Sequence, residues 1–312
     1  MDGPAVVKLR TGVACLTRLV RLLWRGQVAL VHIHVAQRTS CWRKGIFQAV
    51  AKVGRVPVVL HLHGSEFRQF YGDECGPFRR WLVRRMFQSA DQVILLSSQW
   101  REWMECNIPR ARVVVVPNPA VCFVDQRRAE PLVVFLGRLG RRKGVYDLID
   151  AFAALGDVAA DWRLILAGDG EVDAVRRRVG EMGLDGRVSV PGWVGPEARS
   201  QLLSRAGIYV LPSYDEGLPM GLLEAMAAGI AVVSTPIGGI PDAVRDGAEG
   251  VLVTPGDVPA LSDALARLMS DEKLRHRLGE AAARRVEADF SLEASAVCLT
   301  DLYRHLVVGS PT

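Results

Sequence analysis

Short runs of β-branched and other apolar residues alternate along the chain with stretches whose apolar positions recur every three or four residues. The short runs predict buried strands and the periodic stretches predict amphipathic helices, a pattern typical of repeated βαβ units with parallel sheets. Candidate strands in the first half lie at residues 29–34, 56–61, 92–96 and 112–116. A second, longer series lies at residues 132–136, 163–167, 187–190, 208–211, 231–234 and 250–253.

Helical stretches separate the strands of the second series. They cover residues 145–155, 171–182, 196–206 and 222–228, and later 260–269, 274–287 and 292–307. Six strands with helices between them complete a doubly wound α/β domain, and the four earlier strands indicate another domain of the same class. The chain thus predicts two Rossmann-like, doubly wound domains.

The domain boundaries follow from the polar segment at residues 122–131, which ends in a proline and lies between two strands, as linkers do. We predict an N-terminal domain at residues 1–125 and a C-terminal domain at 131–290. The remaining residues, 291–312, are expected to form a helix that packs back toward the N-terminal domain.

The composition of the 312 residues, 49% apolar and 23% charged, agrees with two globular domains and excludes a largely disordered chain. Arg18, Arg21 and Arg25 interrupt the only early apolar stretch, so no run reaches the roughly 18 residues that a membrane span needs. The N-terminus also lacks the layout of a signal peptide. We therefore predict a cytoplasmic protein.

Charge is distributed unevenly between the two halves. Residues 1–130 contain 20 Lys and Arg against 9 Asp and Glu, a net +11, which leaves −6 for residues 131–312. The basic half favours an anionic partner. Clusters such as Arg79, Arg80, Arg84 and Arg85 could contact lipid headgroups at the cytoplasmic face of a membrane, a phosphorylated acceptor or nucleic acid. A solvated helix face explains the same residues equally well.

A glycine-rich turn follows the predicted strand at 132–136 and leads into the next helix. Glycines let a backbone approach a ligand closely, and a helix start attracts anions, so Arg138 and Lys143 beside this turn suggest a diphosphate site. The turn lacks the Gly-Lys-Ser/Thr of a P-loop, and Gly137, Gly140 and Gly144 do not match the G-x-G-x-x-G spacing. On its own it could be an ordinary basic loop.

Residues 211–229 carry the more specific signal. Glu216 follows a strand and precedes a glycine and a proline, whereas Glu224 lies eight residues later inside a predicted helix. Both could be structural charges near a helix start. Together with the free amides around residues 218–222, however, the two carboxylates suit a site that accepts sugar or ribose hydroxyls.

Two further glycine turns, at residues 166–171 and 236–242, also follow predicted strands. The carboxyl ends of parallel strands are where open α/β sheets bind ligands. Each turn alone would be unremarkable, but all of them are expected at the same edge of one sheet.

These motifs together resemble the retaining GT-B glycosyltransferases of family 4, the glycosyl transferases group 1, of the bacterial type that builds exopolysaccharide or lipid-linked oligosaccharide. The resemblance extends from about residue 31 onward and rests on the residues 137–138, 143–144, 167–170, 238–241 and 255–257 and on the pair Glu216-x7-Glu224. It implies transfer of a hexose-type sugar, with retention, from a nucleoside-diphosphate sugar to a glycan or lipid-linked acceptor in cell-surface polysaccharide biosynthesis. Nucleic acid is not an implied partner.

The resemblance also implies roles for individual residues. Arg138 and Lys143 would hold the donor diphosphate, Glu224 the ribose hydroxyls and Glu216 the transferred sugar. His63, in the first domain, would reach the sugar, although a polar strand end would explain it too. The rest of the donor site would comprise Gly137, Gly168, Leu218, Pro219, Met220 and Gly221, together with Trp193 beside the nucleobase unless that ring packs on Pro191.

No metal or cofactor is expected besides the donor substrate. The sequence has no Asp-x-Asp triplet and no His/Cys cluster at ligand spacing, so Arg138, Lys143 and a helix start are the groups available to stabilise a departing nucleoside diphosphate. The resemblance further implies attack from the front side, with a donor phosphate oxygen accepting the acceptor's proton. A phosphate-bearing acceptor would suit Arg38, Arg43 and Lys44.

The first domain departs from the family pattern, because residues 1–24 offer an amphipathic helix where family members have an opening strand and glycine loop. We therefore expect an incomplete N-terminal domain, loosely ordered, and little transfer by the chain as written. The alternatives are a fully active enzyme, a nucleotide-sugar-binding pseudoenzyme, or another GT-B enzyme such as an epimerase or phosphorylase.

Overall fold

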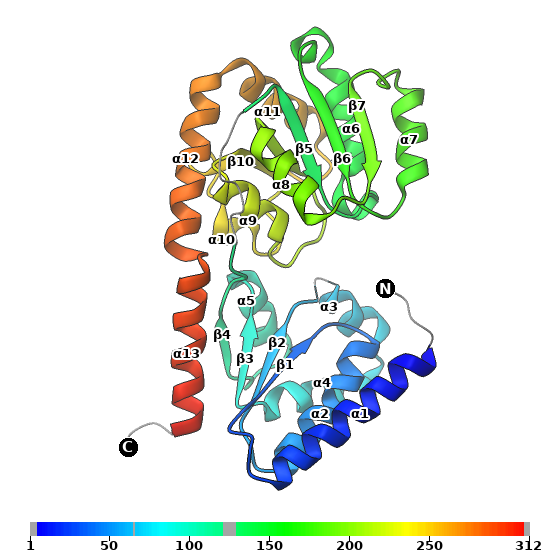
Figure 1. Ribbon diagram of the computed structural model, residues 1–312. Coiled ribbons are helices and arrows are strands. Elements are labelled where there is room, and N and C mark those ends of the chain that lie inside the picture. The colour runs from blue at the N-terminus through cyan, green and yellow to red at the C-terminus, as the bar shows by residue number, and fades with distance from the viewer. Residues whose placement is uncertain (1–4, 65, 121–128, 309–312) are drawn as a thin grey trace. The chain divides into compact units, whose positions relative to one another are not determined.

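The computed structural model describes residues 5–64, 66–120 and 129–308, which form two compact units (Figure 1). One unit comprises Met1–Val116 with Ala296–Thr312, and the other comprises Pro117–Ser295. Both contain a parallel sheet with helices, which confirms the predicted fold class. Most of the predicted linker, residues 122–128, lies outside the described residues.

The first unit contains a four-stranded sheet in the order β1-β2-β3-β4, all parallel. Its strands are β1 (Val31–Val35), β2 (Val58–Leu62), β3 (Gln92–Leu95) and β4 (Val113–Val115). Each starts within two residues of the predicted position. The helices of this unit are α1 (Ala5–Trp24), α2 (Thr39–Val53), α3 (Phe67–Gln69), the π-helix η1 (Phe70–Glu74), α4 (Pro77–Ser89) and α5 (Ser98–Asn107).

The two faces of this sheet bury different sets of residues, because successive side chains of a strand point to opposite faces. On one face, Leu60 and Leu95 join a large core with residues of α2, α4 and α5. On the other face, Val59 and Ile94 pack against Leu299 and further apolar residues of the terminal helix α13 (Leu292–Val308). The last helix thus supplies part of the core of the first unit.

The second unit contains a six-stranded parallel sheet in the order β10-β9-β8-β5-β6-β7. Its strands are β5 (Leu132–Leu136), β6 (Arg163–Ala167), β7 (Val188–Gly192), β8 (Ile208–Leu211), β9 (Ala231–Ser234) and β10 (Gly250–Leu252). The strands that follow β5 in the chain, β6 and β7, extend the sheet on one side. Those that follow β8, namely β9 and β10, extend it on the other side. The strand order therefore reverses between β5 and β8, and open sheets bind ligands at such a switch point.

The longer helices of the second unit lie where the sequence predicted them, whereas the short helices η2 (Arg141–Lys143), η3 (Gly156–Ala159) and α10 (Ile240–Ala243) were not predicted. The longer helices are α6 (Val145–Ala154), α7 (Val172–Glu181), α8 (Pro196–Arg205), α9 (Met220–Ala227), α11 (Val258–Ser270) and α12 (Glu272–Asp289). Asp257 and Asp271 cap α11 and α12 by accepting the amides of Ala260 and Leu274, each at 2.9 Å. These caps explain why both helices begin earlier than their apolar patterns alone indicate.

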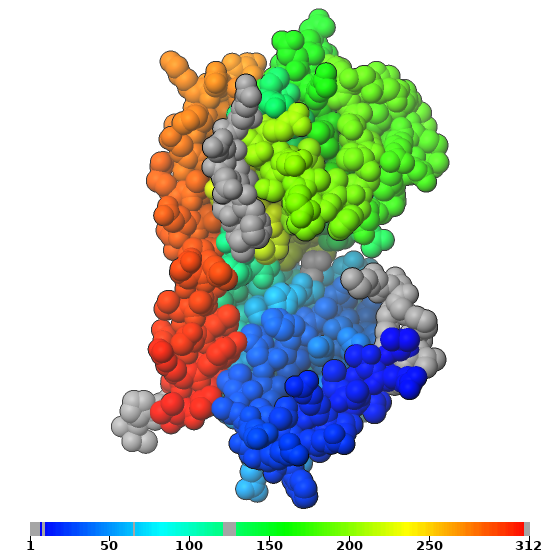
Figure 2. Space-filling model, in the orientation of Figure 1, coloured from blue at the N-terminus to red at the C-terminus, as the bar shows by residue number. Residues whose placement is uncertain are grey.

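No helix formed by the described residues is both long enough and apolar enough to cross a bilayer. The longest, α1, lies at the surface of the first unit (Figure 2). Its last residue, Trp24, is 94% exposed.

Candidate functional site

Two loops meet at the switch point of the second sheet. Residues 137–144 follow β5, and residues 212–219 follow β8, which pairs directly with β5. Gly144 lies against the second loop, because a Cβ on this residue would be 2.0 Å from the carbonyl oxygen of Pro212. With a φ of +69°, the position also suits glycine by conformation. The glycine at 144 thus lets the two loops come together.

This contact brings Lys143 to Glu216. The Lys143 ammonium forms an ion pair with Oε1 of Glu216, and the Ser213 hydroxyl donates to the same oxygen at 2.8 Å. Thr235 in turn donates to the Ser213 carbonyl oxygen at 2.6 Å. Since Glu216 is only 6% exposed, its carboxylate depends on these partners in place of water.

A third loop, after β6, approaches the loop after β5 equally closely. The amide of Gly137 donates to the Ala167 carbonyl at 3.0 Å, and that of Gly168 donates to the Gly192 carbonyl at 2.9 Å. A Cβ on Gly168 would lie 1.7 Å from the Gly137 carbonyl oxygen. Glycine at 168 is therefore required by the backbone that shapes the site.

Replacing Gly168 with alanine should consequently destabilise the second unit. Relieving the overlap must move the loop after β5, at a cost of about 1–3 kcal/mol or more. Thermal unfolding should show a lower midpoint for Gly168→Ala, whereas Gly186→Ala, where a Cβ meets open space, should unfold like the parent chain. Equal midpoints for the two variants would show that the loop after β5 moves without loss of stability.

Helix α9 begins at this edge of the sheet with Met220, and the first amides of a helix have no intrahelical acceptor. Those of Leu222 and Leu223 already donate to the Pro219 carbonyl, at 3.2 and 3.3 Å. Among the described residues, the amides of Met220 and Gly221 have no acceptor and remain for a ligand. Leu218 itself is buried, and its carbonyl accepts the side chain of Asn118 at 3.3 Å.

Glu224, one turn further into α9, forms an ion pair with Arg199 of α8. Burial raises the pKa of the Glu224 carboxyl, and the Arg199 guanidinium opposes that shift. Nε of Arg199 is buried without a hydrogen-bond partner among the described residues. The sequence prediction did not include Arg199. A cation in the first turn of a helix opposes the helix dipole, and that conflict was the available signal.

A pocket of about 360 Å³ opens at this edge of the sheet. Its lining includes most of the predicted donor residues, namely Gly137, Arg138, Lys143, Gly168, Trp193, Pro219, Met220 and Gly221, together with Arg199. Arg138 is exposed and makes no ion pair or hydrogen bond among the residues that the structure describes. Two cations and a helix start thus converge on one hollow, an arrangement that attracts a diphosphate.

Trp193 stands at the rim of this pocket in the loop after β7, and 72% of its surface is exposed. The largely free ring leaves an aromatic face available for stacking.

His63, predicted at the sugar, lies in the first unit directly after β2, and its ring is exposed. Nε2 of His63 is 2.7 Å from Nδ1 of His34. Loss of water around the ring and the proximity of His34 lower the pKa of His63 to about 4, so the imidazole is neutral near pH 7. The ring also packs at 4.0 Å on that of His61, which lies in β2 as predicted. Sequence analysis had found no histidine cluster.

Several cations of the first unit are already engaged by protein groups. Arg38 pairs with Glu66 at 2.5 Å and with Glu74 at 2.6 Å, so its charge is compensated locally. Arg80 donates to the carbonyl oxygen of Tyr71, and Arg84 donates to the Tyr71 hydroxyl at 2.6 Å. Carboxylates therefore compensate the charge of Arg38, whereas the neutral acceptors of Arg80 and Arg84 leave those two charges in place.

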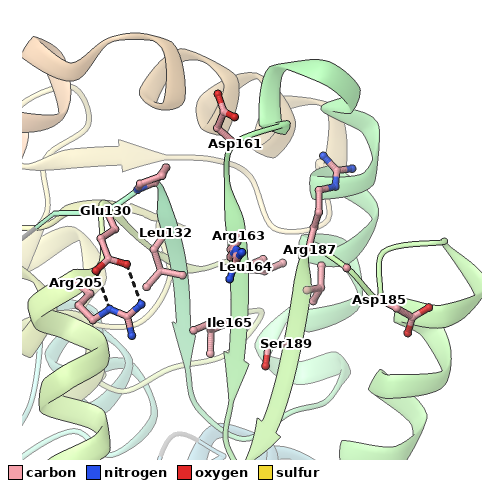
Figure 3. A pocket seen from close by; sticks show the side chains of 13 residues that line it. Glu130, Leu132, Asp161, Arg163, Leu164, Ile165, Asp185, Arg187, Ser189 and Arg205 are labelled. Carbon is pink, nitrogen blue, oxygen red and sulfur yellow. Dashed lines mark hydrogen bonds and ion pairs between the residues drawn. The ribbon is translucent and has the colours of Figure 1, made fainter.

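A second hollow in the second unit, of about 350 Å³, lies along the amino-terminal parts of β5, β6 and β7 (Figure 3). There Arg205 forms an ion pair with Glu130 at 2.8 Å, and Arg187 donates to two backbone carbonyls. Because parallel strands bind ligands at their carboxyl ends, which lie at the opposite edge, the switch point remains the better candidate.

Comparison with known families decides the identity of the chain. Residues 124–285 match the family described as glycosyl transferases group 1, and residues 3–119 match a glycosyl transferase 4-like domain. The chain belongs to the glycosyl transferases group 1. The family match at residues 124–285 covers most of the second unit of this glycosyltransferase, the unit that contains the pocket.

Curated relatives agree with this assignment. The glycosyltransferase is 29% identical over 280 residues to the alpha-D-kanosaminyltransferase of Streptomyces kanamyceticus, a match that covers 82% of this chain and 72% of the relative. It is 27% identical over 301 residues to the N-acetyl-alpha-D-glucosaminyl L-malate synthase of Bacillus anthracis, covering 90% and 75% of the two chains.

Solved structures agree in fold. The glycosyltransferase superimposes on the sucrose-phosphate synthase of Thermosynechococcus elongatus with a TM-score of 0.81 at 24% identity, covering 99% of this chain and 82% of the other. Anabaena HepE in complex with UDP-glucose gives a TM-score of 0.77 at 20% identity, covering 92% and 81%. The GT-B type of fold, with two parallel-sheet α/β domains, is thereby confirmed.

Proposed function

We propose that this glycosyltransferase takes its sugar from a nucleoside-diphosphate sugar bound in the pocket at the switch point of the second unit. The observation that carries the proposal is the convergence of Arg138, Lys143 and the first amides of α9 on one hollow. These groups match the charge and hydrogen-bonding capacity of a diphosphate. The HepE structures, which contain UDP or UDP-glucose in a similar fold, support the same choice of donor.

In this proposal Arg138 and Lys143 bind the diphosphate, and Glu224 accepts hydrogen bonds from the ribose hydroxyls. Glu216 binds the transferred sugar, and His63 contributes a contact to that sugar. Trp193 lies beside the nucleobase, for which its exposed ring is suited. The backbone of Gly137, Gly168, Leu218, Pro219, Met220 and Gly221 completes the donor site.

We further propose that transfer proceeds with retention and without a metal at the diphosphate. The acceptor hydroxyl attacks the anomeric carbon from the side of the leaving group, and the bond from that carbon to the phosphate oxygen breaks. A phosphate oxygen of the departing nucleoside diphosphate takes the proton of the acceptor. Arg138, Lys143 and the start of α9 stabilise the charge that develops on this leaving group.

Calorimetry with UDP and GDP in the presence of EDTA tests the donor proposal. One nucleotide should bind per chain, and magnesium should leave the affinity unchanged because the protein's own cations neutralise the diphosphate. Failure of both nucleotides to bind would contradict the donor assignment. Binding that requires magnesium would instead contradict the absence of a metal at the diphosphate.

For the acceptor we propose a glycan or lipid-linked oligosaccharide of a cell-surface polysaccharide pathway. Among the relatives are the lipopolysaccharide core glycosyltransferase LpsE of Rhizobium meliloti, 35% identical over 64% of this chain and 55% of its own length, and the phosphatidyl-myo-inositol mannosyltransferase of Mycobacterium leprae, 28% identical over 94% and 78%. Both names point to lipid or cell-envelope acceptors. Nucleic acid is not part of the proposal.

A surface of the first unit suits peripheral contact with an anionic membrane. On α4, the exposed rings of Phe78 and Trp81 stack at 6.0 Å, and the Arg85 guanidinium lies 5.8 Å from the Trp81 ring. An apolar groove of about 580 Å³ adjoins them, lined by residues of α2 and α4 that include Ile46 and Leu82. Exposed aromatic rings beside cations are typical of a membrane interface.

Vesicle flotation tests this contact. The chain should float with vesicles that contain phosphatidylglycerol and remain behind with neutral vesicles, and replacing both Trp81 and Arg85 with alanine should reduce the floated fraction severalfold. Arg277→Ala, an exposed cation on α12, serves as the control and should not change it. Equal flotation by the double variant would exclude this surface as the contact.

A further inference from the structure

Four histidines gather on one face of the first sheet. His32 and His34 are two residues apart in β1, and His61 and His63 are two residues apart at the end of β2, a spacing that places each pair on the same face. The register of the two strands sets His34 directly opposite His61. The ring centroids of His32, His34 and His61 lie between 4.6 and 5.3 Å from one another.

The ring nitrogens of this cluster lack the partners that buried polar atoms normally have. Both nitrogens of His61 are buried without a hydrogen-bond partner among the described residues, and so is Nε2 of His32. His61 is only 7% exposed. Since buried polar groups are nearly always satisfied, unpartnered nitrogens at one spot indicate a bound water or ion that satisfies them.

The remaining nitrogens have partners that would orient the rings for such a ligand. Nδ1 of His32 is 2.5 Å from the hydroxyl of Tyr303 on α13, and Nδ1 of His34 is 2.7 Å from Nε2 of His63. If each Nδ1 donates its hydrogen in these contacts, Nε2 of His32 and of His34 keeps a free lone pair. Hydrogen bonds of this kind commonly fix the tautomer of metal-binding histidines.

We propose that His32, His34 and His61 form a binding site for a divalent transition metal of the zinc type. One ring nitrogen of each residue lies within 4.8 Å of the corresponding nitrogens of the other two. A zinc ion with bonds of about 2.05 Å needs them roughly 3.4 Å apart, so the stacked rings of His32 and His34 must rotate toward the ion as it binds. Magnesium and calcium, which prefer oxygen ligands, do not suit three imidazoles.

The ligands of this site all come from the first unit, whereas the groups proposed for the diphosphate belong to the second. The metal is thus separate from the diphosphate, although its ligand His34 contacts His63, the residue proposed at the sugar. Three protein ligands leave a coordination position open on a tetrahedral ion, as in zinc sites that bind a further molecule.

Titration of tag-free, chelator-stripped protein with Zn²⁺ by calorimetry, and with Co²⁺ by visible absorption, tests the proposal. One equivalent should bind, and cobalt should give the intense bands of a low-coordinate site with nitrogen ligands. His61→Ala should weaken Zn²⁺ binding by roughly 100-fold or more, and Tyr303→Phe, which removes the partner of His32, by roughly tenfold. His276→Ala, an exposed histidine on α12, should bind like the parent chain.

Binding of no metal, or equal affinity in the parent, His61→Ala and Tyr303→Phe chains, would overturn the site. Circular dichroism checks that each variant is folded. If His61→Ala does not fold, His34→Gln and Tyr303→Phe decide the matter, because His34 is exposed and Tyr303 keeps its ring in the second variant. None of these measurements uses sugar transfer, so the result stands apart from the proposed function.

Discussion

Removing the charge of Lys143 should lower the affinity of the chain for nucleoside diphosphates by about tenfold or more, since a charge-assisted hydrogen bond contributes roughly 1.5–3 kcal/mol. The same substitution has a second effect. Among the described residues, Glu216 would then lose its ion-pair partner and keep the hydrogen bond from the Ser213 hydroxyl. A buried carboxylate without its cation destabilises the fold, so Lys143→Ala should also unfold more easily.

Arg138→Ala separates these two effects. Arg138 lines the same pocket but is exposed and has no ion pair among the described residues, so its loss should weaken binding and leave the unfolding midpoint in place. Lys273→Ala, an exposed lysine on α12, is the matched control for charge and should alter neither quantity. If calorimetry gave the affinity of the parent chain for both Arg138→Ala and Lys143→Ala, the diphosphate would not bind in this pocket.

Replacing Glu216 and replacing Glu224 should impair different properties of the enzyme. Ribose is common to the free nucleotide and the full donor, so Glu224→Ala should lower affinity for both by about tenfold or more. Glu216→Ala should mainly reduce sugar recognition and turnover. Glu216 forms an ion pair with Lys143. Removing the Glu216 carboxylate therefore frees Lys143 for the diphosphate, and the affinity of Glu216→Ala for the free nucleotide should be preserved.

Calorimetry with the free nucleotide and the full donor, together with single-turnover transfer, distinguishes the two roles. Glu287→Ala, an exposed glutamate on α12, controls for the loss of one negative charge. Because Glu224→Ala also leaves Arg199 without its partner, Glu224→Gln should be measured beside it. Equal losses of free-nucleotide affinity in the Glu216 and Glu224 variants would show that the assignment is wrong.

The sequence predicted the fold in detail where local signals agreed with one another. In the second unit, β5, β6, β8 and β9 have the predicted bounds, because short apolar runs between turns and amphipathic helices leave few alternatives. Glycine turns after these strands also indicated the edge of the sheet at which this pocket opens.

Pairings between distant residues could not be predicted in the same way. Lys143 and Glu216 are 73 positions apart, and only the close approach at Gly144 brings them together. Arg38, expected at a phosphate, instead pairs with two glutamates of a later segment. Such contacts depend on how strands and loops pack in space, which periodicity does not encode.

The histidine cluster could be predicted from the sequence only in part. The spacing of His32 and His34, and of His61 and His63, was visible in the sequence, and each pair had to share a face if it lay in a strand. Their meeting required β1 and β2 to be neighbours in the register observed. The expected loose order of the first domain and its low transfer activity stay predictions.

Hydrogen exchange of the whole chain with and without UDP or GDP locates the bound nucleotide without any substitution. Exchange should be slower in residues 137–144 and at residues 217–222, where α9 starts beside the pocket. Exchange at residues 161–165 and 185–189, along the hollow at the opposite ends of the strands, should not change. Slower exchange at that hollow, or none at the switch point despite saturating nucleotide, would contradict the donor site proposed for this glycosyltransferase.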